Sequence, residues 1–163
     1  MNSGDRRISV ADIEKIIYVI AAELMASLDE PMPPFENHTP SKLEGALAAP
    51  FQSAFEKDIY KDVFEKAAAL FYFVAKDHAF ENGNKRVAVV TLLYYLGLNE
   101  IGIQIGAKEL YRIAVWAVET THSIEKVIRV LSDELRDHSL PYEEWIRSSK
   151  EGDHHAGDPK KIA

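Results

Sequence analysis

Two long apolar segments follow one another near the middle of the chain, with only a few polar residues between them. From Val63 to Asp77, and again from Asn84 to Leu98, most positions carry an aliphatic, aromatic or alanine side chain. Apolar residues on nearly all sides of a helix are typical of a helix buried in a protein core. Two consecutive buried helices need other helices packed around them, so the sequence predicts an all-α fold.

Capping residues indicate where two of the helices begin. Ser9 with Asp12 at the third helical position, and Asp62 with Glu65, both have the spacing of a capping box. The first pair predicts a helix over residues 10–28. Its apolar positions recur at helical spacing. The expected buried face of this helix consists of Ile13, Ile16, Ile17, Ile20 and Leu24.

The rest of the chain divides into helices and polar connectors. Residues 51–60 have neither a helical period nor a clean alternation, which predicts a loop or a weak hairpin. One of the shorter helices has a proline at its first helical position and is ended by a second proline. Further helices are expected over residues 40–49, 107–119 and 124–137, and from Pro141 past Trp145, with connectors at 30–38 and 101–105.

Length, charge and composition exclude several classes of protein. The 163 residues are typical of one domain, which we place at residues 1–147, followed by a polar tail at 148–163. The chain has no cysteine, which excludes disulfides, thiolate metal sites and cysteine nucleophiles. A net charge of −7 argues against a duplex nucleic acid as partner. No targeting segment and no apolar run of about 18 residues are present, so we expect no membrane span and a cytoplasmic location.

The short polar stretch between the two apolar segments carries the chemistry. It reads His78-Ala-Phe80-Glu-Asn82-Gly83, and the next helix then begins with Asn-Lys-Arg. The first backbone N–H groups of a helix lack intrahelical partners, and the helix dipole adds positive charge there. Glycine lets the backbone approach a ligand closely. The sequence therefore predicts an anion site at the start of the second helix.

The charged residues of this stretch favour a phosphate as the anion. Lys85 and Arg86 oppose the helix dipole, at a cost of some tenths of a kcal/mol each, and an anionic ligand would reverse that sign. Histidine is a residue type suited to a base that deprotonates a hydroxyl, and His78 lies one loop before the cations. Each feature alone has an ordinary structural explanation, such as a capping histidine or a solvated helix end. Their conjunction within nine residues favours a site.

The sequence HAFENGNKR at residues 78–86 resembles the HxFx(D/E)GN(G/K)R signature of the Fic/Doc family. The resemblance extends to Leu43–Leu47 before a proline, to Phe64–Leu70 before the histidine and to Leu96–Asn99 after it. It covers residues 8–135 approximately. It implies an all-helical Fic/Doc bundle with a short flap or hairpin before the central helices. It also implies transfer of part of a nucleoside triphosphate, ATP with Mg²⁺, onto a hydroxyl of a protein.

The resemblance also implies roles for single residues. His78 would be the general base, and Phe80 an apolar anchor of the loop. The metal-binding acid of the family falls on Asn82, whose neutral amide oxygen is a weaker ligand for Mg²⁺ than a carboxylate. Glu81 lies one position away and is expected to point elsewhere. The positions that would bind nucleotide phosphates are Gly83, Asn84, Lys85 and Arg86, the first two as the anion hole.

Two departures from the AMP-transferring pattern resemble the Doc-type group. Lys85 stands at the second glycine position of that pattern, and Val89 stands where a second arginine would be. Doc-type members are toxins that phosphorylate a translation factor, elongation factor Tu. The expectation is therefore a protein kinase toxin. An AMP transferase and a nucleotide-binding protein without activity remain as alternatives.

The resemblance extends to partners. Residues 51–60 fall where the family carries a flap that aligns an extended target segment by strand addition, although an ordinary surface connector fits them equally well. The family's inhibitory helix is marked by (S/T)xxxE(G/N), and this sequence has no match to that pattern. A separate antitoxin chain is therefore expected as a second partner, besides the protein substrate.

Overall fold

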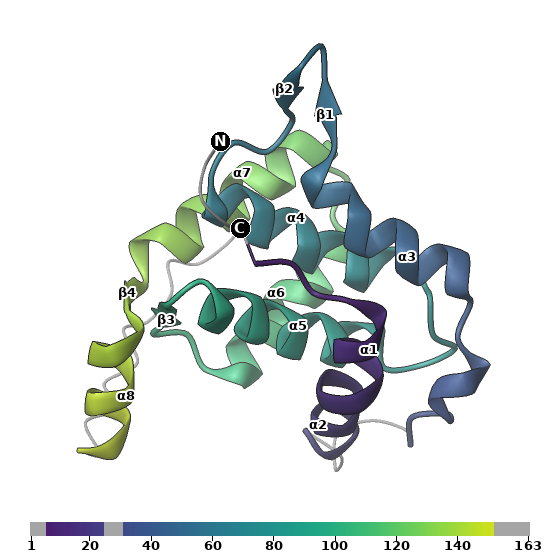
Figure 1. Ribbon diagram of the computed structural model, residues 1–163, viewed down its shortest axis with the longest axis horizontal. Coiled ribbons are helices and arrows are strands. Elements are labelled where there is room, and N and C mark those ends of the chain that lie inside the picture. Colours follow the sequence, from purple (N-terminus) through teal and green to yellow (C-terminus); the bar gives the residue numbers. More distant parts are fainter. Residues whose placement is uncertain (1–5, 25–30, 152–163) are drawn as a thin grey trace.

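The computed structural model describes residues 6–24 and 31–151 of the chain. Within these ranges the protein is a bundle of helices with two small strand pairs at its periphery (Figure 1). Helices α4 (Val63–Lys76) and α5 (Asn84–Leu98) pack against each other at its centre. The predicted all-α fold is confirmed. No helix in the described ranges has both the length and the apolar character that crossing a membrane requires.

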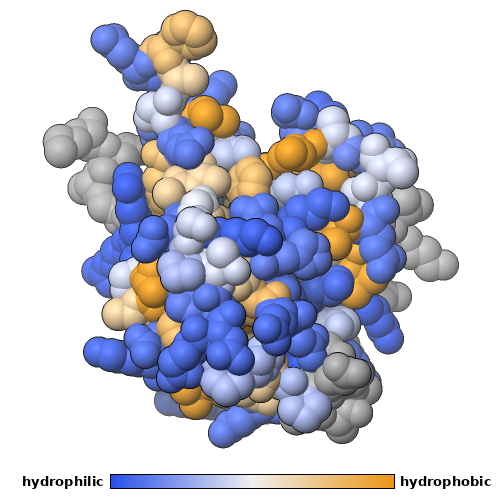
Figure 2. Space-filling model, turned by 90° about the vertical axis from the view of Figure 1, so that its right-hand side faces the viewer, coloured by the Kyte–Doolittle hydropathy of each residue, from blue (hydrophilic) through white to orange (hydrophobic). Residues whose placement is uncertain are grey.

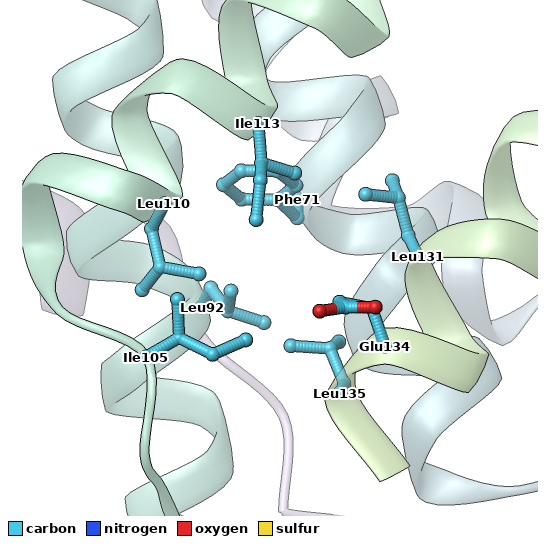
Figure 3. Close-up of a pocket in the computed structure, with 8 residues that line it drawn as sticks. All are labelled: Phe71, Leu92, Ile105, Leu110, Ile113, Leu131, Glu134 and Leu135. Atoms are coloured by element: carbon cyan, nitrogen blue, oxygen red, sulfur yellow. The ribbon is translucent and has the colours of Figure 1, made fainter. Parts of the chain in front are cut away.

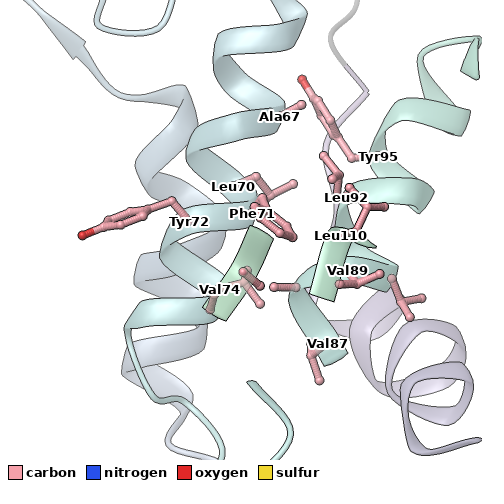
Figure 4. Close-up of a cluster of buried hydrophobic side chains, with 14 of the residues drawn as sticks. Ala67, Leu70, Phe71, Tyr72, Val74, Val87, Val89, Leu92, Tyr95 and Leu110 are labelled. Atoms are coloured by element: carbon pink, nitrogen blue, oxygen red, sulfur yellow. The ribbon is translucent and has the colours of Figure 1, made fainter. Parts of the chain in front are cut away.

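The contact between α4 and α5 forms the core. Three consecutive alanines of α4, residues 67–69, are fully buried, and their small side chains let neighbouring helices approach closely. Figure 4 shows Leu70 and Phe71 of α4 directed towards the side of α5 that carries Leu92, whereas Tyr72 points away. Because close-packed interiors resist deformation, this core holds both ends of the polar loop at residues 77–83 in place.

The N-terminus of α4 has a modified capping box. The Asp62 carboxylate accepts hydrogen bonds from the N–H groups of Phe64 and Glu65, each at 2.9 Å. The Glu65 carboxylate accepts from the N–H of Lys61 at 2.7 Å, one residue before the expected partner. Burial by itself raises the pKa of Asp62, but the backbone bonds and the nearby Arg136 outweigh it, so that the pKa is lowered. The charged cap thereby stabilises the start of α4.

The surrounding helices cover this pair on several sides. Helices α3, α6 and α7 contact α4, and α6 also contacts α5. The Ser123 hydroxyl caps α7 by accepting from the N–H of Lys126 at 3.3 Å. These helices confirm the predictions for their segments: α3 spans Pro40–Ala48, α6 spans Ala107–Glu119 and α7 spans Ile124–Asp137.

A small apolar cavity lies between α4, α5, α6 and α7. Figure 3 shows the Glu134 carboxylate directed into it among leucine, isoleucine and phenylalanine side chains. Glu134 is 7% exposed, and its Oε1 atom has no hydrogen-bond partner among the described residues. The His138 Nδ1 atom lies 3.4 Å from that oxygen, which makes an ion pair when the histidine is protonated. None of the residues that line this cavity lines the polar pocket next to the 77–83 loop.

The first helix differs from its prediction in its buried face and its end. Ser9 and Asp12 form the predicted capping box at the start of α1 (Val10–Asp12). A π-helical turn, η1 (Ile13–Ile17), follows and leads into α2 (Tyr18–Glu23). The π turn holds an extra residue, so it rotates the following residues around the helix axis. The buried residues of η1 and α2 are therefore Ile13, Ile17, Tyr18 and Ala21.

The predicted buried face and the predicted end of the first helix are therefore both corrected. Ile16 is 39% exposed and Ile20 is 46% exposed, although both were expected in the core. Leu24 has extended backbone angles, so the helix ends at Glu23 and does not continue towards Leu28 as predicted. The remaining part of the predicted helix, residues 25–28, lies outside the described ranges.

The segment between α3 and α4 is the predicted weak hairpin. After a short 3-10 turn, η3 (Ala49–Phe51), strands β1 (Ser53–Ala54) and β2 (Lys57–Asp58) pair in antiparallel register, with Ser53 opposite Asp58. Phe55 and Glu56 form the turn, with φ angles of 51° and 63°. Before α3, residues 31–38 form the predicted connector, which includes the 3-10 turn η2 (Phe35–Asn37).

The second strand pair corrects the prediction for residues 101–105. Strand β3 (Ile101–Ile103) pairs antiparallel with β4 (Ser139–Pro141), instead of serving only as a connector. Helix α8 (Tyr142–Lys150) follows and carries Trp145, whose Cβ lies 2.2 Å from where a side chain at Gly102 would begin. The predicted helix is thus confirmed, but it continues three residues past the proposed domain end at 147. Residues 152–163 of the proposed tail lie outside the described ranges.

Candidate functional site

The 77–83 loop and the start of α5 line a polar pocket, here called the loop pocket. Helix α4 contributes Ala75 to its wall, and α6 contributes Tyr111. The structure therefore brings the predicted site residues together, with the exception of Phe80. The remaining residues that line the loop pocket are His78, Glu81, Asn82, Gly83, Asn84, Lys85 and Arg86.

His78 follows α4 directly and has a left-handed backbone. Its φ angle is 50°, and its side chain is exposed at the loop pocket. A non-glycine residue in this conformation carries strain of about 1–3 kcal/mol, which is typical of functional sites. The preceding Asp77 is half-buried. Burial raises the pKa of Asp77, and the charges of His78 and Lys42 partly oppose that rise.

Phe80 lies behind the loop pocket in an aromatic cluster. It is 3% exposed, and its ring centroid lies 5.0 Å from that of Tyr18 and 6.0 Å from that of Phe35. The Tyr18 hydroxyl donates a hydrogen bond to the Pro33 carbonyl, which attaches the 31–38 connector to this cluster. The cluster fixes the back of the loop, so that the polar residues on either side of Phe80 are held at the loop pocket.

Two asparagine side chains are used within the loop. The Asn84 amide accepts from the Phe80 N–H at 3.1 Å and donates to the Phe80 carbonyl at 2.8 Å. The Asn82 Oδ1 atom accepts from the Gly83 N–H at 2.8 Å. The anion hole expected at Gly83 and Asn84 is thus altered: the Asn84 side chain clamps the loop, and the Gly83 N–H already has an acceptor. The Asn84 backbone N–H is the group of this pair left to face an anion.

The start of α5 provides cationic groups. The first hydrogen bond of the α5 ladder runs from the Val87 N–H to the Gly83 carbonyl at 2.9 Å, so earlier N–H groups point out of the helix. Lys85 is half-buried at the loop pocket, and its ammonium group pairs with no described residue. Arg86 is only 1% exposed although it lines the same pocket. Burial raises the pKa of Tyr18, and the charge of Arg86 opposes that rise.

Gly83 meets two requirements of the loop. Its φ angle is 84°, and a Cβ atom there would lie 2.8 Å from the Met32 Sδ atom. We expect Gly83→Ala to lower the free energy of unfolding by about 1–3 kcal/mol in urea denaturation, because a side chain strains this backbone and displaces Met32. Gly45→Ala is the matched control: that position on α3 is open, so helix propensity predicts a gain of about 0.5–1 kcal/mol. Equal stability of the Gly83 variant and the parent would contradict the assignment.

The sequence did not indicate that Glu81 and Tyr111 line the loop pocket. Glu81 was expected to point elsewhere, yet it lines the pocket as part of an irregular loop that has no strand or helix periodicity. Tyr111 belongs to α6, next to the buried face that carries Leu110. Its contact with the loop comes from helix packing and leaves no local signal in the sequence.

The loop pocket contains no preformed metal site made of the usual side chains. In residues 6–24 and 31–151, no group of three His, Cys, Asp or Glu residues is close enough to hold a metal ion. The Asn82 oxygen, at the position of the family's acid, is engaged with Gly83. Any Mg²⁺ bound here would therefore depend on the oxygens of a nucleotide and on a few protein groups. The histidine, the cations and the helix start suit a phosphate ester.

The protein is thus a helical bundle in which a histidine-bearing loop lies against a helix start that carries two cationic residues. Residues 10–96 match the profile of the Fic/DOC family, which is more than half of the chain. The chain therefore belongs to the Fic/Doc family, as a Doc-type member. This family consists of transferases that generally use ATP with Mg²⁺.

A curated relative and the solved structures complete the comparison. The chain is 37% identical over 65 residues to "Toxin Doc" of Mycolicibacterium smegmatis, a match that covers 40% of this chain and 48% of the relative. The match thus spans about half the length of that relative. No solved structure matches the chain.

Proposed function

We propose that this protein is a Doc-type toxin that transfers a phosphoryl group from ATP, bound with Mg²⁺, to a hydroxyl of a protein in the cytoplasm. The substrate class is a translation factor such as elongation factor Tu. The observation that carries the proposal is the loop pocket, where His78 lies with Lys85 and Arg86 at the start of α5. The relative named Toxin Doc supports the toxin class and a separate antitoxin chain as partner.

The proposed step uses the residues of the loop pocket in distinct roles. The His78 imidazole accepts the proton of the target hydroxyl, and the hydroxyl oxygen forms a bond to the γ-phosphorus. The bond between that phosphorus and the bridging oxygen breaks, and ADP leaves with the bonding electrons. Lys85, Arg86 and the outward N–H groups of α5 stabilise the negative charge on the phosphate oxygens. Mg²⁺, when bound with the nucleotide, neutralises further charge.

The hairpin is proposed as the docking element for the target. Figure 2 shows it projecting at the top of the molecule with a hydrophobic tip, where Phe55 is 99% exposed. The buried Lys66 of α4 holds it through Asp58, with 3.4 Å between Nζ and Oδ2. Hydrogen bonds from Ser53 and then from Lys66, together with the charge of Lys66, lower the pKa of Asp58. Its ion pair is thus present at neutral pH.

The position of the hairpin limits how a target binds. Lys66 lies in the N-terminal part of α4, and His78 follows the C-terminal end of that helix. The axial distance from Lys66 to Lys76 is about 15 Å at 1.5 Å per residue. A target segment that pairs with the hairpin therefore needs about five extended residues to bring its hydroxyl to His78.

Mass spectrometry of intact proteins tests the proposed reaction. Purified protein is incubated with ATP, Mg²⁺ and a cell extract, and the masses of the extract proteins are compared with those from a reaction without ATP. The expected result is a protein that gains one phosphate. A gain of AMP would identify a nucleotidyl transferase instead. No gain, in an extract containing the translation factors, would favour a nucleotide-binding protein without activity, which is the alternative raised by Asn82.

A further inference from the structure

Glu81 is the one carboxylate among the described residues that line the loop pocket. Its side chain is exposed and makes no hydrogen bond or ion pair with a described residue. The cations Lys85 and Arg86 line the same pocket. A carboxylate left without a partner beside two cations raises the electrostatic cost of binding a phosphate. That cost disappears when a metal ion binds between the carboxylate and the phosphate oxygens.

Asn82 is poorly placed to serve as the metal ligand. Its Oδ1 atom accepts the Gly83 N–H at 2.8 Å, so coordination of a metal would compete with this bond. Loss of such a hydrogen bond costs about 0.5–1.5 kcal/mol. The amide oxygen is also neutral, whereas Mg²⁺ favours the anionic oxygens of carboxylates and phosphates. The Asn82 side chain is therefore better explained as a cap that shapes the loop.

The backbone of the loop explains how a neighbouring residue can take over the role. Residues 81–83 of the loop and residues 84–86 at the start of α5 all line the pocket. In a strand, adjacent side chains would point to opposite faces. In this irregular loop both Glu81 and Asn82 line the pocket, so a carboxylate is present at the pocket although position 82 is an asparagine.

We propose that Glu81, and not Asn82, is the protein's carboxylate ligand for the Mg²⁺ that accompanies the nucleotide. This inference rests on the proposed function, because it requires a metal–nucleotide complex in the loop pocket. Glu81 would supply one hard anionic oxygen, and the nucleotide phosphates held by Lys85 and Arg86 would supply others. The family's metal-binding acid would thus be displaced by one position in this chain.

Direct measurement of metal binding tests the proposal without relying on activity. Mn²⁺ serves as the probe, its binding is followed by electron paramagnetic resonance, and a non-hydrolysable ATP analogue is the nucleotide. Loss of outer-shell groups alone typically lowers metal affinity 10–100-fold. We therefore expect Glu81→Gln to weaken Mn²⁺ binding in the presence of the nucleotide by at least about tenfold. Metal-free nucleotide should bind Glu81→Gln as well as the parent or better, because a negative charge is removed.

Three further variants separate the metal ligand from general charge and from the loop cap. Glu44→Gln makes the same charge change on α3, outside the loop pocket, and should bind Mn²⁺ as the parent does. Asn82→Ala removes the amide oxygen that accepts the Gly83 N–H, and should retain most of the Mn²⁺ affinity. Asn82→Asp in the Glu81→Gln background adds a carboxylate at the neighbouring position and should restore part of the lost binding. Circular dichroism checks that each variant is folded.

The outcomes distinguish this proposal from the proposed function. Parental Mn²⁺ affinity in Glu81→Gln, combined with a loss in Asn82→Ala, would overturn the role of Glu81 and leave the transferase proposal intact. Equal Mn²⁺ affinity in every variant would show that the nucleotide alone holds the metal. That result would also overturn the role of Glu81. A parent protein that binds no nucleotide, with or without Mn²⁺, would overturn both proposals.

Discussion

Replacement of His78 by alanine is expected to lower the rate of phosphoryl transfer about 10²–10⁴-fold, which is the usual contribution of a general base. The imidazole is exposed at the loop pocket and pairs with no other described residue, so its removal should leave nucleotide affinity nearly unchanged. Transfer is measured with radiolabelled ATP on the identified target, and affinity by calorimetry. If expression of the parent arrests growth, the same substitution should abolish the arrest.

A glycine at this position provides the matched control. Because His78 has a φ angle of 50°, His78→Gly removes the imidazole and also relieves the strained backbone. We expect this variant to be as inactive as His78→Ala but more stable to urea by about 1 kcal/mol. A fully active alanine or glycine variant would remove His78 from the mechanism. Equal stability of the two variants would contradict the strain assigned to this residue.

Replacement of Arg86 by alanine is expected to weaken nucleotide binding by about 1.5–3 kcal/mol, the typical contribution of a hydrogen bond to a charged group. Arg86 is 1% exposed, so truncation also leaves a cavity in the interior. We therefore expect a second effect, a free energy of unfolding lower by about 2–5 kcal/mol, similar to other large-to-small changes of buried side chains. Calorimetry with ATP and urea denaturation measure the two effects separately.

A substitution of Lys85 serves as a control that separates the loss of nucleotide binding from the loss of stability. It lines the loop pocket next to Arg86 but is only half-buried. Lys85→Ala should weaken nucleotide binding without a comparable loss of stability, since no large cavity is created. If Arg86→Ala remains folded and binds ATP as tightly as the parent, the phosphate site does not include Arg86.

Features encoded within a few consecutive residues could be predicted from the sequence. The two apolar segments predicted α4 and α5, and the capping residues Ser9 and Asp62 predicted where two helices begin. The polar residues between the apolar segments identified the loop that lines the pocket. Periodicity and capping depend on neighbours within one or two helical turns, so this information is present in the linear chain.

The sequence by itself therefore determined the all-α class, the approximate helix positions and the location of the loop pocket. Tertiary structure decided which side chains face the pocket and which are buried. Glu81 lines the pocket as part of the irregular loop, and Tyr111 reaches it because α6 packs beside α5. Ile16 and Ile20 are exposed because a π turn rotates the first helix. Such directions depend on contacts between residues distant in the chain, which no local pattern records.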